Sequence, residues 1–444
     1  MEHLKYAFVR DNAFVVRAEP RKFIHGTFSS LKIRNFRLYF IGQAISMSGT
    51  FMQMVAQSWL VLQLTNSGTA LGLVTAMQFL PILILGPWGG VIADRFPKRK
   101  LIYVTQTLSG VFALILGILV ATGLVRLWMV YVLSLLLGII SAVDNPVRQT
   151  FIFEMVGHDE LRNAVTLSST QVNLARVIGP ILAGVLIATV GLAPCFILNA
   201  LSYVAVLVVL YFMRASELRP VVPVPLAKGQ LREGLNYVKS TPVVRDVLIM
   251  MAIIGMLTYE FQVSLPLLAQ VTFHGDAGSY AALTAATGIG SVIGGLLLAG
   301  RKKTVPHTVV IAALLFGFTV LITSVMPTLA LAMAALLLVG VFSIYFTSLG
   351  NTLIQLYSAP QMRGRVMAYW SMAFLGSTTI GGPIIGWIGQ NVSPRWSLAV
   401  GGISAMIAAG WGWMTFRNVH ALKNEPAKVV GEAESRAEGD VRVP

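Results

Sequence analysis

Ionisable side chains inside long apolar stretches are the first candidates for chemistry in this sequence. Three acids lie in such stretches, Asp144, Glu154 and Glu260, together with one base, Arg176. A charge in the interior of a bilayer costs ~3 kcal/mol or more unless it is paired or hydrated, so such residues are usually functional. Glu154 lies close to the end of its stretch, and we expect it at the membrane surface. The other three are candidates for moving protons or binding a solute.

Glu260 is the sharpest candidate for proton coupling. It lies ~24 Å along an apolar stretch that begins near residue 244, past the middle of a bilayer. A carboxyl group in a low-dielectric cavity can bind and release protons near neutral pH. A glutamate that is simply satisfied by neighbouring hydroxyl groups is the alternative.

Asp144 is the second candidate for proton coupling. Arg148 follows it by one helical turn and can pair with Asp144 or with Asp94. We expect an ion-pair cluster that closes one side of the membrane, with direct substrate contact as the alternative. Arg176 lies ~21 Å into its own stretch and needs either an acidic partner, for which Asp144 is available, or an anionic substrate.

Polar and aromatic side chains near these charges are candidates for lining a solute cavity. Gln53 and Gln57 share one face of the first apolar stretch. The full set of cavity candidates is Gln53, Gln57, Arg176, Tyr259, Gln262 and Trp370. A cavity rich in aromatic and Met side chains suits hydrophobic or amphipathic solutes, and a packing or lipid-facing role is the alternative for each residue.

The composition requires that lipid surrounds most of the chain. Of the 444 residues, 56% are hydrophobic and 11% are charged, whereas soluble domains average about 25% charged residues. Twelve apolar stretches are long enough to cross a bilayer as helices, namely 36–64, 70–93, 101–122, 127–154, 162–190, 194–213, 244–272, 279–300, 306–325, 328–357, 363–390 and 395–416. The expected fold class is an all-α membrane protein with twelve transmembrane helices.

The Lys and Arg residues alternate between loops in a way that predicts orientation. Of the 33, 30 fall in the N-terminal segment, in every second loop or in the C-terminal tail. Positively charged loops remain in the cytoplasm, so both termini are expected there. The net charge of +15 therefore indicates membrane topology rather than nucleic-acid binding.

The longest polar connection, residues 214–243, divides the stretches into six and six. Its prolines indicate an irregular linker, followed by a short amphipathic helix near 228–240. We expect five regions: a cytoplasmic N-terminal segment 1–34, a six-helix bundle 35–213, the cytoplasmic linker 214–243, a second bundle 244–417 and a disordered cytoplasmic tail 418–444.

The two halves carry matching features at a nearly constant spacing, which indicates an internal repeat. Gly179, Pro180 and Gly184 correspond in this way to Gly382, Pro383 and Gly386. The Gly-Pro pairs are expected to kink their helices and to permit close packing. Two homologous, pseudo-symmetric six-helix halves are the simplest account, and a transporter of this construction binds its substrate between the halves and rocks them around the site.

The loop after the second stretch resembles a motif of the major facilitator superfamily. Residues Gly90, Asp94, Arg95, Arg99 and Lys100 match that motif, and Pro97 stands where the superfamily usually has Gly. The resemblance implies the major facilitator fold and a cytoplasmic gate, to which we assign Gly90, Asp94, Arg95, Arg99 and Arg148. The glycine in this motif is expected to allow close helix contact.

Further segments resemble the enterobactin-exporter-like branch of bacterial facilitator transporters. They are 35–46, 59–62, 144–148 and 173–184, and the resemblance runs from about residue 30 to 415. It implies an exporter (an antiporter) of small molecules such as siderophores, drugs or metabolites, located in the cytoplasmic (inner) membrane and driven by the proton gradient.

Motifs of other classes are absent from the sequence. There is no phosphate-binding loop for ATP, no His-Glu-x-x-His metal motif and no cysteine pair, since Cys195 is the single cysteine. We expect no cofactor, no metal and no enzyme activity. The expected partners are a small-molecule substrate, protons and the lipid bilayer, with no nucleic acid, in a monomer. An uptake facilitator or substrate sensor of the same fold and a membrane-embedded enzyme are the rival interpretations.

Overall fold

The structure, a computed structural model, describes residues 28–219, 230–299, 304–359 and 361–417. Within these ranges it is helical and contains no strand. The first half comprises η1 (Ser29–Lys32), α2 (Arg34–Thr65), α3 (Gly68–Arg95), α4 (Lys98–Ala121), α5 (Leu127–Val190), α6 (Ala193–Phe212) and η2 (Ala215–Glu217). The second comprises α7 (Gln230–Ser240), α8 (Pro242–Leu257), α9 (Phe261–Leu267), η3 (Leu268–Thr272), α10 (Ala277–Ala299), α11 (Pro306–Val325), α12 (Leu329–Tyr357), α13 (Arg363–Ser371), η4 (Met372–Gly376), α14 (Thr378–Asn391) and α15 (Pro394–Phe416).

The helices that span a membrane are compatible with the expected twelve. Among the described residues, ten helices are long and apolar enough to cross a bilayer. One of them, α5, has 64 residues and covers two expected stretches, with a break in helical geometry at Gly157 (φ 72°, ψ −169°). The expected first stretch lies in α2, which has 32 residues and a more polar composition.

Local sequence signals explain where several helices begin. The Ser67 hydroxyl accepts the Ala70 N–H at the start of α3, and the Thr328 hydroxyl accepts the Leu331 N–H at the start of α12. Side-chain oxygens at this position satisfy amide groups that lack a partner within the helix. Pro242, Pro306 and Pro394 occupy the first turn of their helices, where a missing N–H costs nothing.

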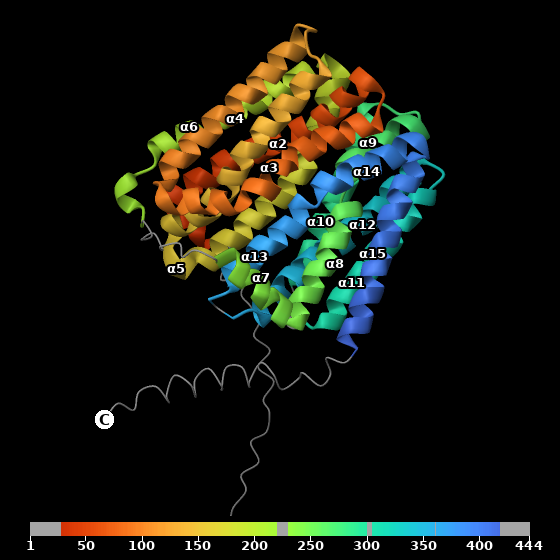
Figure 1. Ribbon diagram of the computed structural model, residues 1–444. Coiled ribbons are helices and arrows are strands. Elements are labelled where there is room, and N and C mark those ends of the chain that lie inside the picture. Colours follow the sequence, from red (N-terminus) through yellow and green to blue (C-terminus); the bar gives the residue numbers. More distant parts are fainter. Residues whose placement is uncertain (1–27, 220–229, 300–303, 360, 418–444) are drawn as a thin grey trace, which may run out of the picture.

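Two helical bundles lie side by side (Figure 1). Helices α2 to α6 pack mainly on one another, and helices α8 to α15 do the same. The bundles meet where α3 packs on α14 and where α5 packs on α10. This arrangement confirms the expected all-α fold in two halves.

The bundles have two distinct ends, which we name by their residues. The basic end carries Lys98, Arg99, Arg214, Arg245 and Arg363. The Asn66 end carries Asn66, Gly191, His274 and Asn391, all located at the opposite helix termini.

The expected domain boundaries fall partly outside the described residues. Residues 1–27, most of the expected N-terminal segment, and the tail from 418 onward lie outside them, as do residues 220–229 of the linker. The linker helix near 228–240 corresponds to α7, where Glu233 forms an ion pair of 2.8 Å with Arg365 of α13. This contact attaches the linker to the second bundle at its basic end.

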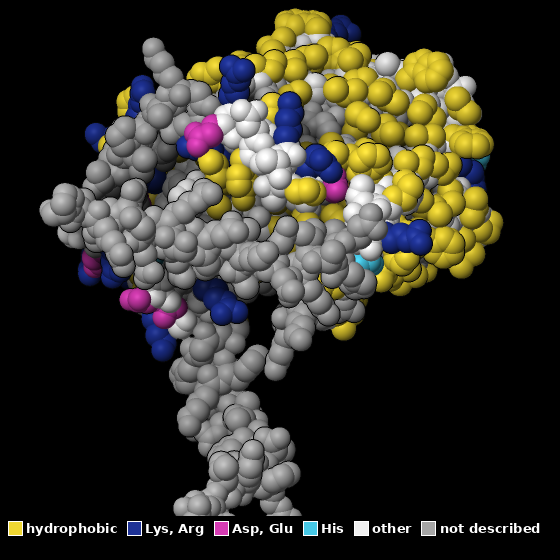
Figure 2. Space-filling model, turned by 60° about the horizontal axis from the view of Figure 1, so that its bottom comes forward, with side chains coloured by type: hydrophobic (Ala, Val, Ile, Leu, Met, Phe, Trp, Pro, Cys, Tyr) yellow, Lys and Arg dark blue, Asp and Glu magenta, His cyan; other side chains and the backbone are white. Residues whose placement is uncertain are grey.

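The molecular surface has the character expected of a membrane protein. Figure 2 shows an almost continuous hydrophobic flank, and Lys and Arg side chains on the face that lies at the bottom of Figure 1. Large exposed hydrophobic side chains on the flank helices include Trp88, Tyr211, Leu296 and Met414. The chain is therefore a multi-pass membrane protein whose apolar exterior matches lipid.

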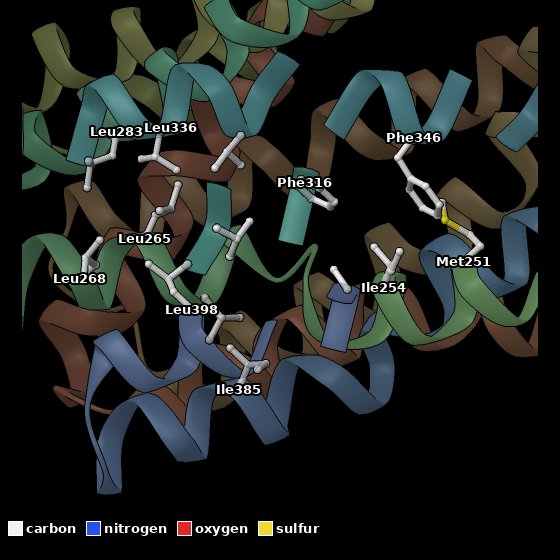
Figure 3. Close-up of a cluster of buried hydrophobic side chains, with 14 of the residues drawn as sticks. Met251, Ile254, Leu265, Leu268, Leu283, Phe316, Leu336, Phe346, Ile385 and Leu398 are labelled. Carbon is white, nitrogen blue, oxygen red and sulfur yellow. The ribbon is translucent and has the colours of Figure 1, made fainter. Parts of the chain in front are cut away.

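The core of the second bundle holds the short helix α9 in place. In Figure 3, Leu265 of α9 and Leu268 of η3 point among Leu283, Leu336 and Leu398, which come from neighbouring helices. Burying a Leu side chain stabilises a fold by roughly 1.5–3 kcal/mol in water; in lipid, the comparable gain comes from close packing. The segment after Glu260 is therefore fixed rather than loose.

Candidate functional site

The span that carries Glu260 is discontinuous. Helix α8 ends at Leu257, and α9 begins at Phe261, with Glu260 in a non-helical conformation between them (φ −79°, ψ 38°). The Thr258 hydroxyl donates to the Gly401 carbonyl at 2.7 Å, so part of the break is tied to α15. Pro266 contributes to the irregularity because it has no N–H and crowds the carbonyl of Gln262, four residues earlier. Discontinuous helices of this kind line binding sites in membrane transport proteins.

The Glu260 carboxyl is buried without a hydrogen-bond partner. The residue is 2% exposed, and neither carboxyl oxygen has a partner among the described atoms. The Thr378 hydroxyl lies beside the carboxyl but does not reach hydrogen-bond geometry. An ionised carboxylate in such a place is strongly disfavoured relative to a protonated one.

Helix α14 approaches the break very closely. A Cβ built on Gly381 would lie 1.6 Å from the Met256 carbonyl oxygen and 3.0 Å from Glu260 Oε1. A side chain at this position would fill the space that the carboxyl now occupies. The span of α14 is itself irregular, because the π-helical segment η4 precedes it, and such segments are frequent at functional sites.

The same glycines form a crossing between the two bundles. A Cβ on Gly72 of α3 would lie 2.2 Å from the Gly382 carbonyl oxygen, and a Cβ on Gly386 would lie 2.2 Å from the Gly68 carbonyl oxygen. Each helix thus presents a Gly-x-x-x-Gly pair, the pattern that lets membrane helices approach backbone to backbone. We call this set, Gly68, Gly72, Gly382 and Gly386, the glycine crossing.

Hydrogen bonds between the bundles extend the contact to the Asn66 end. The Ser67 hydroxyl donates to Gln390 Oε1 at 2.7 Å, and the Thr69 N–H donates to the same oxygen at 3.0 Å. Gln270 donates to the Asn66 side chain at 3.3 Å. The two bundles are therefore closed against each other at this end.

Asp144 lies in a different and fully partnered site. The residue is 6% exposed, and its Oδ2 accepts a hydrogen bond from Arg148, which also donates to Gln43. Its Oδ1 accepts from the Thr105 hydroxyl and from Gln106 Nε2. Of the two partners left open for Arg148, the structure places Asp144 beside it, and Asp144 does not pair with Arg176.

Arg176 lies between the bundles. Its guanidinium carbon is 5.8 Å from the centroid of the Phe51 ring, and the Tyr259 side chain is close enough to interact with its charge. Its backbone carbonyl meets α10 at Gly288, where a Cβ would lie 2.8 Å away. The position joins α2 and α5 of one bundle to the broken span of the other.

The three amide candidates share one polar pocket. Gln53, Gln57 and Gln262 all line it, with Thr75 and Asn199 among its other residues. Asn199 donates to Gln53 Oε1 at 2.7 Å, and Gln57 donates to the Ser134 hydroxyl at 3.0 Å. Thr75 also lies near Glu260, because a Cβ on Gly382 would be 3.6 Å from both Thr75 Cβ and Glu260 Oε2. The pocket therefore reaches close to the buried carboxyl.

The two aromatic candidates have different environments. Tyr259 adjoins the break and packs against Phe261, Phe316 and Phe374, with ring centroids 5.0–6.3 Å away, and its hydroxyl bonds to Ser343. Trp370 is buried in the second bundle, where a Cβ on Gly350 would lie 2.9 Å from its ring. Tyr259 thus contacts aromatic side chains of its own bundle beside the break, Trp370 is buried in that bundle, and a cavity-lining role stays a prediction for both.

The residues expected to form a gate lie mainly within the first bundle. Arg99 donates to the Leu210 carbonyl at 3.0 and 2.6 Å and so caps the C-terminus of α6, while Arg95 is exposed. The side chain of Asp94 lies outside the described residues. The expected close contact at Gly90 is wrong: a Cβ there meets nothing within 4 Å, whereas one at the preceding Gly89 would lie 1.9 Å from the Ala142 carbonyl oxygen. The helix turn places Gly89, not Gly90, towards α5.

The glycines around Pro180 in α5 allow neighbouring helices to approach closely. A Cβ on Gly179 would lie 2.5 Å from Phe51 Cβ, and one on Gly184 would lie 2.9 Å from Ala281 Cβ. Within α5, non-helical backbone angles occur at Gly157, far from Pro180. The first glycine thus lets α2 approach, and the second lets α10 of the other bundle approach.

Sequence reasoning missed several residues of these sites. Lys98 pairs with Glu154 at 2.8 Å, and both side chains are buried within the protein. The expected position of Glu154 at the membrane surface stays a prediction. Asp246 is also buried and pairs with Arg245 at 2.9 Å. The basic loop around Lys98 was visible as a charge run, but its partner was not. In the described part of the chain, no group of three or more His, Cys, Asp or Glu could hold a metal ion.

Comparisons with known proteins identify relatives over most of the chain. Residues 25–435 match a family model described as transmembrane secretion effector. The staphyloferrin A transporter of Staphylococcus aureus is 25% identical over 338 residues, which cover 75% of this chain and 84% of that protein. The enterobactin exporter EntS of Citrobacter koseri is 25% identical over 374 residues, which cover 84% of this chain and 89% of that protein.

Solved structures share the fold at low sequence identity. A bacterial homologue of the human lysosomal transporter Spinster, in an inward-facing and unoccupied conformation, superposes with a TM-score of 0.68 at 15% identity, over 86% of this chain and 97% of that chain. The nucleoside transporter NupG superposes with a TM-score of 0.68 at 12% identity, over 86% and 99%. This likeness confirms the expected two-bundle membrane fold.

Proposed function

The chain belongs to the transmembrane secretion effector family of the major facilitator superfamily, and from that premise we propose that it exports small molecules in exchange for protons by alternating access. The expected resemblance to enterobactin exporters extends over 84% of the chain. Because these relatives are named for enterobactin and staphyloferrin A, the cargo that we propose is a siderophore or another small metabolite or drug.

The contrast between two buried acids carries the assignment of the proton site. Asp144 has a hydrogen-bond donor on each carboxyl oxygen, including the Arg148 guanidinium. In the described part of the chain, neither carboxyl oxygen of Glu260 has a hydrogen-bond donor. A paired carboxylate is stable in its ionised form, whereas an unpaired one in a low-dielectric site is stable only when it is protonated. Glu260 therefore carries the proton, and Asp144 serves as part of a structural ion pair.

The glycine crossing supplies the conformational step. It covers Glu260 from the side of the first bundle, through Gly72 and Thr75. When the bundles separate at the Asn66 end, water reaches the carboxyl, and ionisation becomes favourable. When they close again, the carboxyl must be protonated. Such a cycle links proton transfer to rocking of the bundles.

The charge distribution supports an orientation for this cycle. The Lys and Arg residues gather at the basic end, so this end and both termini face the cytoplasm. The closed Asn66 end then faces the outside. The location that follows is the cytoplasmic membrane.

The residues assigned to the cytoplasmic gate have a supporting role in this scheme. Arg99 joins α4 to the end of α6, and Arg148 joins α5 to Gln43 of α2. Both sets of bonds lie inside the first bundle. They keep that bundle rigid while it rotates against the other one.

The function is tested in cells and then in vesicles. Cells with and without this protein are loaded with labelled enterobactin or staphyloferrin A, and export is followed over time. Proteoliposomes then compare cargo counterflow with and without an imposed pH gradient. Acceleration by the gradient supports antiport, whereas counterflow that ignores the gradient supports the uptake facilitator or sensor. Activity of detergent-solubilised protein on the cargo, without vesicles, would favour the enzyme.

A further inference from the structure

Arg176 is a permanently charged side chain without a counter-charge. Among the described residues it forms neither an ion pair nor a hydrogen bond with an acceptor; its guanidinium lies over the Phe51 ring and is close enough to Tyr259 for that side chain to interact with its charge. The guanidinium group does not lose its proton in proteins. An unpaired cation inside a membrane span is costly and is retained where a ligand or water completes its environment.

Arg148, in the same bundle, is an arginine whose charge is paired within the protein, and it serves as a comparison for Arg176. It lies in the same long helix, α5, and donates both to Asp144 and to Gln43. Its charge is neutralised within the protein, so it needs no ligand. The difference between the two arginines indicates that the partner of Arg176 comes from outside the chain.

The surroundings of Arg176 define what that partner looks like. Pro180, one turn further along α5, lines a cavity with Phe51, Phe261 and Gln262, contributed by both bundles. The Phe51 ring lies 5.8 Å from the guanidinium carbon, and the Tyr259 hydroxyl, which is hydrogen-bonded to Ser343 in the second bundle, is close enough to interact with its charge. The site offers one positive charge for an anionic oxygen and flat apolar walls for the group that carries it.

We propose that Arg176 binds an anionic group of the cargo, so that the exported class consists of organic anions with an apolar or aromatic part next to a carboxylate or a comparable acidic group. This inference rests on the proposed function of export, and it narrows the proposed cargo by excluding cations. A guanidinium pairs with a carboxylate through two parallel hydrogen bonds, and the Phe51 and Tyr259 rings pack against the adjoining part of the molecule.

The charge of the cargo has a measurable electrical consequence. An anion that leaves while a proton enters moves charge in the same electrical sense in both steps. The membrane potential therefore drives export of an anion more strongly than export of a neutral molecule, whereas a monovalent cation exchanged for one proton moves no net charge.

The first test needs no ligand. Full-length protein is purified in detergent, and thermal unfolding is compared for wild type, Arg176→Gln and Arg148→Gln. Arg176→Gln removes an unpaired, half-buried charge and is expected to raise the Tm, whereas Arg148→Gln leaves the Asp144 carboxylate without its cationic partner and is expected to lower the Tm. A loss for Arg176→Gln as large as that for Arg148→Gln would mean that Arg176 has a structural partner, and the inference would be overturned.

The second test uses salicylate, benzoate and citrate as probes, with the uncharged salicylamide as the matched control. At least one of the three carboxylates is expected to bind the wild type and the exposed-loop variant Arg126→Gln, and to bind Arg176→Gln about tenfold more weakly or worse. Salicylamide is expected to show no such dependence. Failure of all three carboxylates to bind, or equal binding by Arg176→Gln, overturns the inference.

The two proposals fail separately. If carboxylate binding depends on Arg176 but transport ignores the pH gradient, the proposed antiport is wrong and the anion site stands. If transport depends on Glu260 and the pH gradient while Arg176→Gln binds and exports carboxylates normally, only the anion site is wrong.

Discussion

Glu260 lies directly against Gly382, since a Cβ built on that glycine would stand 3.6 Å from the carboxyl oxygen Oε2. Gly382 belongs to the glycine crossing, where it meets Gly72 of the other bundle. The residue that we assign to proton transfer and the contact that closes the bundles therefore both lie against Gly382 of α14. A change in the spacing of the bundles must change the environment of the carboxyl.

We predict that one methyl group added at the glycine crossing separates the two bundles. Gly72→Ala places a Cβ 2.2 Å from the Gly382 carbonyl oxygen, so the bundles must separate at the Asn66 end. Overpacking of this kind costs about 1–3 kcal/mol, which shifts a two-state equilibrium by roughly 5- to 150-fold. Ser67→Cys and Gln390→Cys, joined by a short bifunctional maleimide, report the closed state, and Gly72→Ala is expected to lower their cross-linking.

Gly410 supplies the matched control for that measurement. A Cβ at Gly410 meets nothing within 4 Å, so Gly410→Ala should leave the cross-linking yield unchanged. The native Cys195 is buried and contributes little background. If the double-cysteine protein gives the same cross-linking yield with and without Gly72→Ala, the glycine crossing does not hold the bundles together.

The ion pair between Lys98 and Glu154 leads to a prediction about stability. Replacing one partner should destabilise the protein strongly, whereas replacing both should destabilise it only a little. The two side chains are 7% and 9% exposed. Lys98→Met leaves a buried carboxylate without its partner and should cost about 3–5 kcal/mol, whereas Lys98→Met with Glu154→Met should recover most of that loss. The free energy of unfolding is measured in mixed detergent micelles.

An exposed pair near the linker is the control for this prediction. Arg214 and Glu217 also form an ion pair of 2.9 Å, but their side chains are 62% and 40% exposed. Arg214→Met is expected to cost less than about 1 kcal/mol. A loss for Lys98→Met that is no larger than this would contradict the burial of the pair.

We predict that Asp276, at the start of α10, contributes to the stability of the protein in a pH-dependent way. The pKa of its carboxyl is lowered below the ordinary value of 3.8, chiefly because the Ser279 backbone N–H donates to it, and further by the Ser279 hydroxyl. A depressed pKa means that the stabilisation is complete at neutral pH and is lost as the pH falls below that ordinary value. Asp276→Ala should therefore cost about 1 kcal/mol at neutral pH.

Thermal unfolding at neutral pH and at about pH 3 checks this prediction. The difference between wild type and Asp276→Ala should shrink in acid. Asp276→Asn, which keeps a capping oxygen but cannot ionise, should show a difference from wild type that disappears in acid. The same loss for Asp276→Ala at both pH values would mean that the carboxylate charge is irrelevant.

Much of the fold could be predicted because hydrophobic length and charge placement are local properties of the sequence. The stretch 363–390, for example, corresponds to α13, η4 and α14. The break at Glu260 could not be located in this way, because residues 258–260 include no Gly or Pro, and Pro266 lies six residues after Glu260. It depends on contacts with α14 and α15, which become visible only when the helices are packed.

The candidate site was predictable as a set of residue types but not as a set of partners. Glu260, Asp144 and Arg176 were recognisable as charges in apolar stretches. Which of them pair depends on how the helices are rotated against each other, and Asp144 faces Arg148 rather than Arg176. The same limitation explains why Gly90 was expected at a contact that Gly89 makes.

The most direct test of the account is gradient-driven transport by Glu260→Gln. Proteoliposomes that contain wild type or the variant are compared for cargo accumulation under an imposed pH gradient and for cargo counterflow without one. The glutamine resembles a protonated carboxyl and cannot release a proton, so accumulation should be lost while counterflow persists. Accumulation by Glu260→Gln that equals the wild type under the same gradient would contradict the assignment of Glu260 as the proton carrier.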